Sequence, residues 1–117
     1  MSNAWDGFDA IGIVVDWIDA CRKRELDMLL ALYDEEATVE CCEGGSFRGR
    51  SQIARYWRPK LAAAASSAFE IDALMPEADG VLLDYRGYDG EPVRTHFSFN
   101  DDGKIRFTAC FPISVAA

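Results

Sequence analysis

The side chains best suited to metal or nucleophilic chemistry in this sequence are its cysteines and its single histidine. They are Cys21, Cys41, Cys42, Cys110 and His96. A structural zinc site usually needs four cysteine or histidine ligands, often including a C-x-x-C pair, which is missing here. We therefore expect no metal site. Adjacent cysteines rarely bridge each other, because a disulfide needs a wider Cα separation. All four are interpreted as the reduced, buried thiols of a cytosolic protein.

Charged side chains alternate along the second half of the chain. Asp84, Arg86, Arg94 and Arg106 fall on strand faces, where they could pair across neighbouring strands. One interpretation is a carboxylate–arginine site that activates water, and the other is a set of solvated salt bridges.

Aromatic side chains recur through the first half of the chain. Trp17, Tyr33, Tyr56 and Trp57 could form a wall for a ring-shaped ligand. Core packing explains the same spacing, and one side chain can serve both purposes, so both interpretations stay open.

The elements that must position these side chains begin with a helix over residues 8–24. Its polar residues Asp9, Asp16 and Lys23 recur one heptad apart, and apolar residues fill the rest of the circumference. A polar stripe this narrow is typical of a helix that is largely wrapped by protein.

Shorter elements follow in the region up to residue 64. We expect a second helix over 26–33, a strand over 37–42, an extended piece at 47–49 and a third helix over 52–64. Ser51 is the expected cap of the third helix. Pro59 should kink that helix or shift its register.

The second half of the chain alternates in the manner of β-strands. The expected strands are 69–75, 81–88, 92–99 and 105–111. Their short connections predict an antiparallel meander. Alternation places Thr95 and Phe97 on one face and His96 on the other.

The last expected strand has no clearly polar face. Its apolar set of Ile105, Phe107, Ala109 and Phe111 opposes Arg106, Thr108 and Cys110. Helices can cover only one face of a sheet, and an exposed apolar face is unfavourable for a monomer. This pattern predicts a homodimer that packs through the outer sheet face.

Composition fits a single domain over residues 1–117. The formal net charge of −8 argues against a nucleic-acid partner, which needs clustered lysine and arginine. No apolar run is long enough to span a bilayer, and no basic segment precedes one at the start of the sequence, so we expect no membrane partner and a cytoplasmic protein.

Several strings, in this order and spacing, resemble the nuclear transport factor 2-like superfamily, in particular its SnoaL-like and ketosteroid isomerase-like branches. They are LDMLLALYDEEATVE at 26–40, FRGRSQI at 47–53 and HFSFNDDGKI at 96–105. The resemblance implies an α+β cone (a cystatin-like roll), with three N-terminal helices in the concave face of a strongly bent antiparallel sheet. It also implies a deep apolar pocket at the wide end of the cone, and dimers through the outer sheet face.

The catalytic positions of ketosteroid isomerases are replaced in this chain. The resemblance places Cys41 where those enzymes have their general-base aspartate, and Trp17 and Thr95 where they have their oxyanion donors. Proton abstraction next to a carbonyl needs both a base and such donors. We therefore expect no steroid isomerase activity. Dehydratases of this fold that use two histidines are equally unlike a chain with His96 alone.

The most specific catalytic hypothesis that remains is a role for the Cys41 thiol. A thiolate there could act as nucleophile or base if a neighbour lowered its pKa, but His96 is expected to point away and the surrounding chain is acidic. The competing interpretation is a small apolar side chain in the pocket wall.

The expected function is binding of a small apolar molecule, without a cofactor. The alternatives are a lyase, isomerase or hydrolase acting on a small hydrophobic metabolite, and a structural or partner-binding dimer. The expected ligand-binding residues are Trp17, Tyr33, Cys41, Tyr56, Trp57, Tyr85, Thr95, Phe97 and Thr108.

Overall fold

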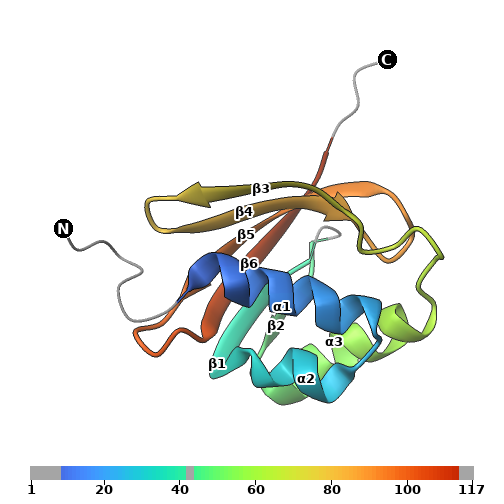
Figure 1. Ribbon diagram of the computed structural model, residues 1–117. Helices are drawn as coiled ribbons and strands as arrows, with labels where there is room; N and C mark the ends of the chain where they lie inside the picture. The colour runs from blue at the N-terminus through green and yellow to red at the C-terminus, as the bar shows by residue number, and fades with distance from the viewer. Residues whose placement is uncertain (1–8, 42–43, 114–117) are drawn as a thin grey trace.

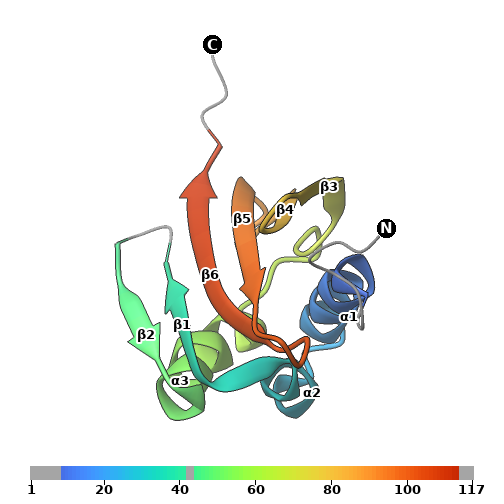
Figure 2. The same cartoon turned by 90° about the vertical axis from the view of Figure 1, so that its left-hand side faces the viewer.

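The computed structural model describes residues 9–41 and 44–113, and it forms an α+β fold as predicted. Its helices are α1 (Ala10–Arg22), α2 (Leu26–Ala31) and α3 (Arg50–Ala62). Its strands are β1 (Tyr33–Glu40), β2 (Ser46–Arg48), β3 (Ile71–Glu77), β4 (Gly80–Arg86), β5 (Pro92–Phe99) and β6 (Ile105–Pro112). The three helices lie together on one side of a bent sheet (Figures 1 and 2).

The sheet has the strand order β2-β1-β6-β5-β4-β3. Strands β3 to β6 form the predicted antiparallel meander. The expectation of a wholly antiparallel sheet is wrong at one place, because β1 pairs with β6 in parallel. After β1 the chain crosses through β2 and α3 to the far edge of the sheet, and the meander then returns to lie beside β1 in the same direction.

Helices α1 and α3 are capped differently at their N-termini. The Asp9 side chain caps α1 and accepts a hydrogen bond from the Gly12 backbone N–H at 2.9 Å. The cap of α3 is Gly49, with φ of 83°, and not Ser51 as predicted. Glycine adopts this left-handed backbone without steric cost. Pro59 lies inside α3, which continues to Ala62.

Tyr33 begins β1, although its spacing placed it at the end of the second helix. The Ile105 N–H donates to the Leu32 carbonyl at 2.8 Å, which joins this point to β6. The Arg50 guanidinium donates twice to the Tyr33 carbonyl, from Nε at 3.1 Å and from Nη2 at 2.6 Å. These long-range contacts override the local helical pattern.

Strand alternation is confirmed in β5 and fails in β6. Thr95 and Phe97 face the helices and are buried, whereas His96 lies on the outer face. In β6 the register shifts opposite Ser98 and Phe99. This irregularity puts Ile105 in the core while Phe111 is 54 % exposed on the outer face, so the expectation that Ile105 shares a face with Phe111 is wrong.

The core lies between the helices and the inner sheet face. Trp17 is at its centre, with its ring edge-on to Trp57, Tyr85 and Phe97 at centroid distances of 5.5, 5.5 and 4.9 Å. In the part of the chain that the structure describes, no helix is long and apolar enough to cross a membrane.

Candidate functional site

A cavity of about 330 Å³ opens between α3, the end of β1 and the ends of the meander strands. Its wall is largely aromatic and apolar, with one lysine and with acidic residues from the β4–β5 loop. The residues that matter for its chemistry are Cys41, Tyr56, Trp57, Lys60, Tyr85, Tyr88, Val93 and Cys110.

The nine residues expected to bind a ligand fall into two groups. Cys41, Tyr56, Trp57 and Tyr85 line the cavity. The other five are buried in the core and are not part of the cavity wall: Trp17, Tyr33, Thr95, Phe97 and Thr108. Whether any of the nine contacts a ligand stays a prediction.

Tyr33 ties the cavity wall to the core. Its hydroxyl oxygen accepts one hydrogen bond from Trp17 Nε1 at 3.0 Å and another from Trp57 Nε1 at 3.2 Å. Burial raises the pKa of the Tyr33 phenol. This neutral hydroxyl holds the Trp57 ring, which lines the cavity.

The phenols in the cavity wall are neutral hydrogen-bonding groups. Burial raises the pKa of Tyr56 and of Tyr85, and the interaction with Cys41 raises that of Tyr56 further. Both hydroxyls therefore keep their protons at neutral pH. Groups of this kind can donate to a carbonyl or an oxyanion on a ligand.

A lysine provides the positive charge in this wall. Lys60 Nζ lies 4.1 Å from the centroid of the Tyr88 ring and 4.8 Å from that of Tyr56. Such cation–π contacts hold the ammonium beside the aromatic surface. A ligand that combines a ring with an anionic group would match both features.

The cysteines do not all follow the expectation of reduced thiols. Cys21 and Cys41 are thiols, and burial raises the pKa of Cys21 well above its ordinary value. Cys110, which lies in the cavity wall, is disulfide-bonded, so the prediction is wrong at this position. Cys42 lies outside the described residues.

Thr95 is a buried polar residue whose side chain is not fully hydrogen-bonded. Among the described residues its Oγ1 has no partner in hydrogen-bonding geometry. The hydroxyl lies close enough to Tyr85 to oppose part of the rise that burial causes in the pKa of that phenol. It belongs to the core beneath the cavity and not to the cavity wall.

The charged residues of the outer sheet face pair across strands. Arg94 donates from Nε and Nη2 to the two Asp84 carboxylate oxygens at 2.7 and 2.8 Å. Arg86 Nε lies 3.4 Å from Asp72. The salt-bridge interpretation of these residues is therefore confirmed for both pairs.

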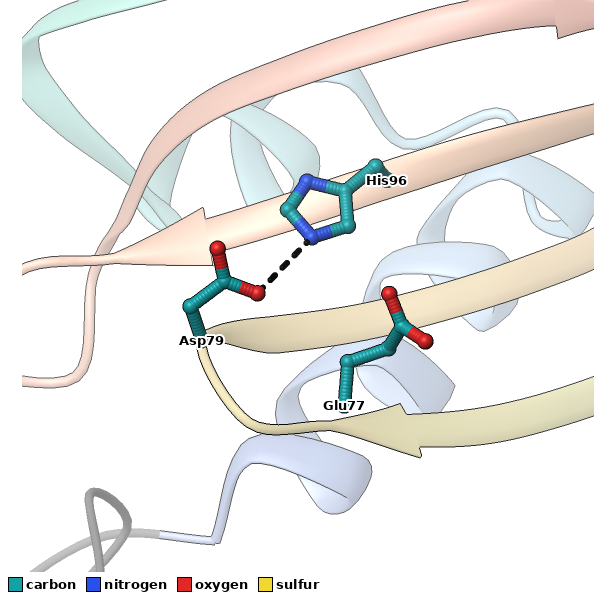
Figure 3. Close-up of side chains that lie close together, drawn as sticks. All are labelled: Glu77, Asp79 and His96. Atoms are coloured by element: carbon teal, nitrogen blue, oxygen red, sulfur yellow. Dashed lines mark ion pairs between the residues drawn. The ribbon is translucent and has the colours of Figure 1, made fainter.

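His96 belongs to a cluster on the outer face that the sequence did not reveal. Its Nε2 lies 3.5 Å from an Asp79 carboxylate oxygen, and Glu77 lies beside them (Figure 3). The turn between β3 and β4 brings the two acidic residues next to β5. The alternation of β5 could have placed His96 on this face, but not the turn opposite it.

The chain has clear relatives by family and by fold. Residues 14–108 match the SnoaL-like domain family. A comparison with curated proteins found no match.

Solved structures share the fold across nearly the whole chain. A SnoaL-like protein of unknown function from Burkholderia thailandensis is 26 % identical with a TM-score of 0.80, over 90 % of this chain and 94 % of the other. A proposed polyketide cyclase from Sinorhizobium meliloti is 26 % identical with a TM-score of 0.73, over 85 % and 93 %. A steroid Δ-isomerase from Pseudomonas aeruginosa is 15 % identical with a TM-score of 0.71, over 97 % and 85 %, which shows likeness of fold alone.

Proposed function

Since the chain belongs to the SnoaL-like family, we propose that it binds a small, ring-shaped and largely apolar molecule in the cavity beside α3. The observation that carries this proposal is the wall itself, in which Tyr56, Trp57, Tyr85 and Tyr88 surround about 330 Å³. Aromatic walls with a few polar groups are typical of small-molecule sites. Lys60, with Asp89 and Glu91 in the same wall, favours a ligand with a polar substituent at one edge of its ring.

The orientation of such a ligand follows from the polar groups in the wall. The hydroxyls of Tyr56 and Tyr85 are protonated, so each can donate to a ligand oxygen, whereas Lys60 attracts negative charge. The rings supply apolar contact but little directional preference. The polar groups therefore select among ligands that the rings would accept equally.

A fluorescent probe tests this proposal without knowledge of the natural ligand. Anilinonaphthalene sulfonate combines fused rings with an anion, and its emission rises in an apolar site. We expect saturable binding to the folded protein. Val93→Phe should weaken it at least about tenfold, because the added ring volume fills the cavity and ends contact with the wall.

The matched control is Val15→Phe, which adds the same ring volume at a residue of α1 that is 41 % exposed and lies outside the cavity. It should bind the probe as the unmodified protein does. Equal affinities for Val93→Phe and the unmodified protein would reject the cavity as the binding site.

Turnover of a small hydrophobic metabolite, by a lyase, isomerase or hydrolase, is the second candidate. It is favoured by the Cys41 thiol, which shares the cavity wall with the phenols of Tyr56 and Tyr85. A thiolate could accept a proton from a carbon next to a carbonyl whose oxygen is held by a phenol. Solvent deuterium should then enter a cyclic ketone in the presence of the protein but not of Cys41→Ala. Equal incorporation with both proteins would leave the binding role alone.

The third part of the proposal is a homodimer through the outer sheet face. It is supported by Phe111, which projects from β6 on the side of the sheet opposite to the helices. A second copy would cover this ring. A structural or partner-binding role for that dimer is the alternative in which the cavity holds no ligand.

We propose that the protein is located in the cytoplasm. The oxidation state of its cysteines in the cell tests this location. The thiols of Cys21 and Cys41 agree with a reducing compartment, whereas the disulfide at Cys110 favours an oxidising one. Alkylation of free thiols at the moment of lysis, followed by peptide mapping, tests this location: an alkylated Cys110 would show that the disulfide is absent in the cell, as a reducing compartment requires. A protected Cys110 would instead favour an oxidising compartment.

A further inference from the structure

We propose that Glu77, Asp79 and His96 form a surface site for a divalent transition-metal ion of the zinc class. One ligand atom from each residue, two carboxylate oxygens and one imidazole nitrogen, lies within 4.8 Å of the others. The site lies on the outer sheet face, and none of its residues lines the cavity beside α3. It therefore goes beyond the proposed binding function and does not depend on it.

The backbone holds the three donors together. Glu77 is the last residue of β3, Gly80 is the first of β4, and the two pair in register, so Asp79 lies in a tight turn. Strand β5 pairs along β4 and presents His96 beside this turn. Figure 3 shows the imidazole and the Asp79 carboxylate pointing toward each other from β5 and the turn, with the Glu77 side chain on the same side.

Gly80 supplies the room that the imidazole needs. A Cβ atom on this residue would lie 2.9 Å from His96 Nε2 and 2.0 Å from the Phe97 carbonyl oxygen. Glycine therefore lets the imidazole lie over the start of β4, with Nε2 directed at the turn. The His96 side chain is 21 % exposed, so it is the anchored member of the set, whereas that of Asp79 is 83 % exposed and adjusts freely.

The distances agree with metal coordination. Tetrahedral zinc holds nitrogen and oxygen ligands at about 2.0–2.1 Å, which puts neighbouring ligand atoms about 3.3 Å apart. His96 Nε2 and Asp79 Oδ1 are already 3.5 Å apart. The Glu77 carboxylate oxygen lies within 4.8 Å of the other two ligand atoms, and rotation of its exposed side chain can shorten these distances. Water would complete the shell.

The donor set selects the class of ion. Imidazole nitrogen favours zinc and its neighbours over calcium and magnesium, which prefer oxygen ligands alone. The two carboxylates offset the ionic charge, and the net charge of −8 on the chain attracts cations in general. This set differs from the four-ligand cysteine and histidine site that the sequence argued against. Bound metal would fasten the β3–β4 turn to β5.

The single histidine makes the test direct, because only one imidazole contributes ring signals to a nitrogen–proton correlation spectrum. Untagged protein is titrated with zinc chloride. We expect the Nε2 signal of His96 to move and saturate at one equivalent, with backbone shifts confined to the β3–β4 turn and its neighbours on β5. Calorimetry should show affinity at least about tenfold weaker for Glu77→Gln and Asp79→Asn, and no binding at this site for His96→Gln.

The matched control is Glu70→Gln, which removes an equal charge from an exposed residue just before β3. It should bind zinc as the unmodified protein does. The ring signal reports on His96 alone, so zinc bound by cysteine thiols elsewhere does not affect the result. An unmoved His96 signal at saturating zinc would overturn the proposal. Equal weakening by Glu70→Gln and Glu77→Gln would overturn it too, since it would mean attraction by overall charge.

Discussion

At the scale of single residues, the Tyr33 hydroxyl joins two buried indole rings, one in the core and one in the cavity wall. It accepts hydrogen bonds from the indole N–H groups of Trp17 and Trp57, and all three side chains are almost fully buried. A buried donor that loses its acceptor keeps its desolvation cost with nothing to offset it. Stability and the shape of the cavity wall therefore depend on the same oxygen.

Tyr33→Phe should lower the free energy of unfolding by about 2–4 kcal/mol, because it leaves two indole donors buried without an acceptor. The measurement is urea denaturation followed by circular dichroism. Tyr88→Phe is the control, since it removes a hydroxyl from a half-buried ring, and should change stability by less than about 0.5 kcal/mol. Similar losses for the two variants would show that the hydroxyl of Tyr33 has no special structural role.

Some of the residues that line the cavity could be predicted from the sequence, and others could not. Cys41 could be placed by its resemblance to a known fold and Trp57 by the recurrence of aromatic residues, and both line the cavity. Lys60, Tyr88 and Val93 could not, because the β4–β5 loop folds against α3 through contacts between residues far apart in the chain. One such contact is the hydrogen bond from the Ala65 N–H to the Tyr88 carbonyl at 2.7 Å.

At the scale of elements, the pairing of β4 with β5 is reinforced by one bidentate ion pair. Arg94 holds both oxygens of Asp84, which lies opposite it in register. The hydrogen bond from Arg94 lowers the pKa of the Asp84 carboxyl from its ordinary value of 3.8. A carboxyl whose pKa is lower in the folded chain stabilises the fold above its unfolded value, and this stability is lost as the pH falls through the folded value.

Asp84→Asn should therefore make stability less sensitive to acid. Between about pH 5 and about pH 2, the unfolding free energy of the unmodified protein should fall more steeply than that of the variant. Urea denaturation at a series of pH values measures both slopes. Asp101→Asn, in an exposed turn, is the control and should keep the steeper slope. Parallel slopes for the unmodified protein and Asp84→Asn would contradict this role of the ion pair.

Strand pairing shows how far the alternation of residue types can predict the sheet. Alternation correctly placed Thr95, Phe97 and His96, because β5 is regular in the stretch that holds them. The same alternation misassigned β6, since a register shift is set by the partner strand and leaves no trace in the residue types. The parallel pairing of β1 with β6 was likewise invisible, because it depends on the path of the chain through α3.

At the scale of the whole molecule, the sheet has one face covered by helices and one face open. On the open face Phe111 lies opposite Arg94 in register, so an apolar ring stands among charged side chains. A second copy would bury this ring, and the charged side chains around it would lie at the polar rim of such an interface.

Phe111→Ser should weaken self-association at least about tenfold, because it removes the most exposed large ring on the open face. Light scattering over a dilution series measures this change. Met28→Ser is the matched control: Met28 is 45 % exposed on α2, on the side of the helices, and its loss should leave association unchanged. An unmodified protein that is monomeric at micromolar concentration would contradict the dimer altogether.

The cavity beside α3 is proposed as a binding site, and a crystal structure of the protein soaked with anilinonaphthalene sulfonate is the most direct test. We expect density for the rings between Tyr56, Trp57 and Tyr88, with the sulfonate toward Lys60. Probe density on the open sheet face at Phe111, with an empty cavity, would contradict it.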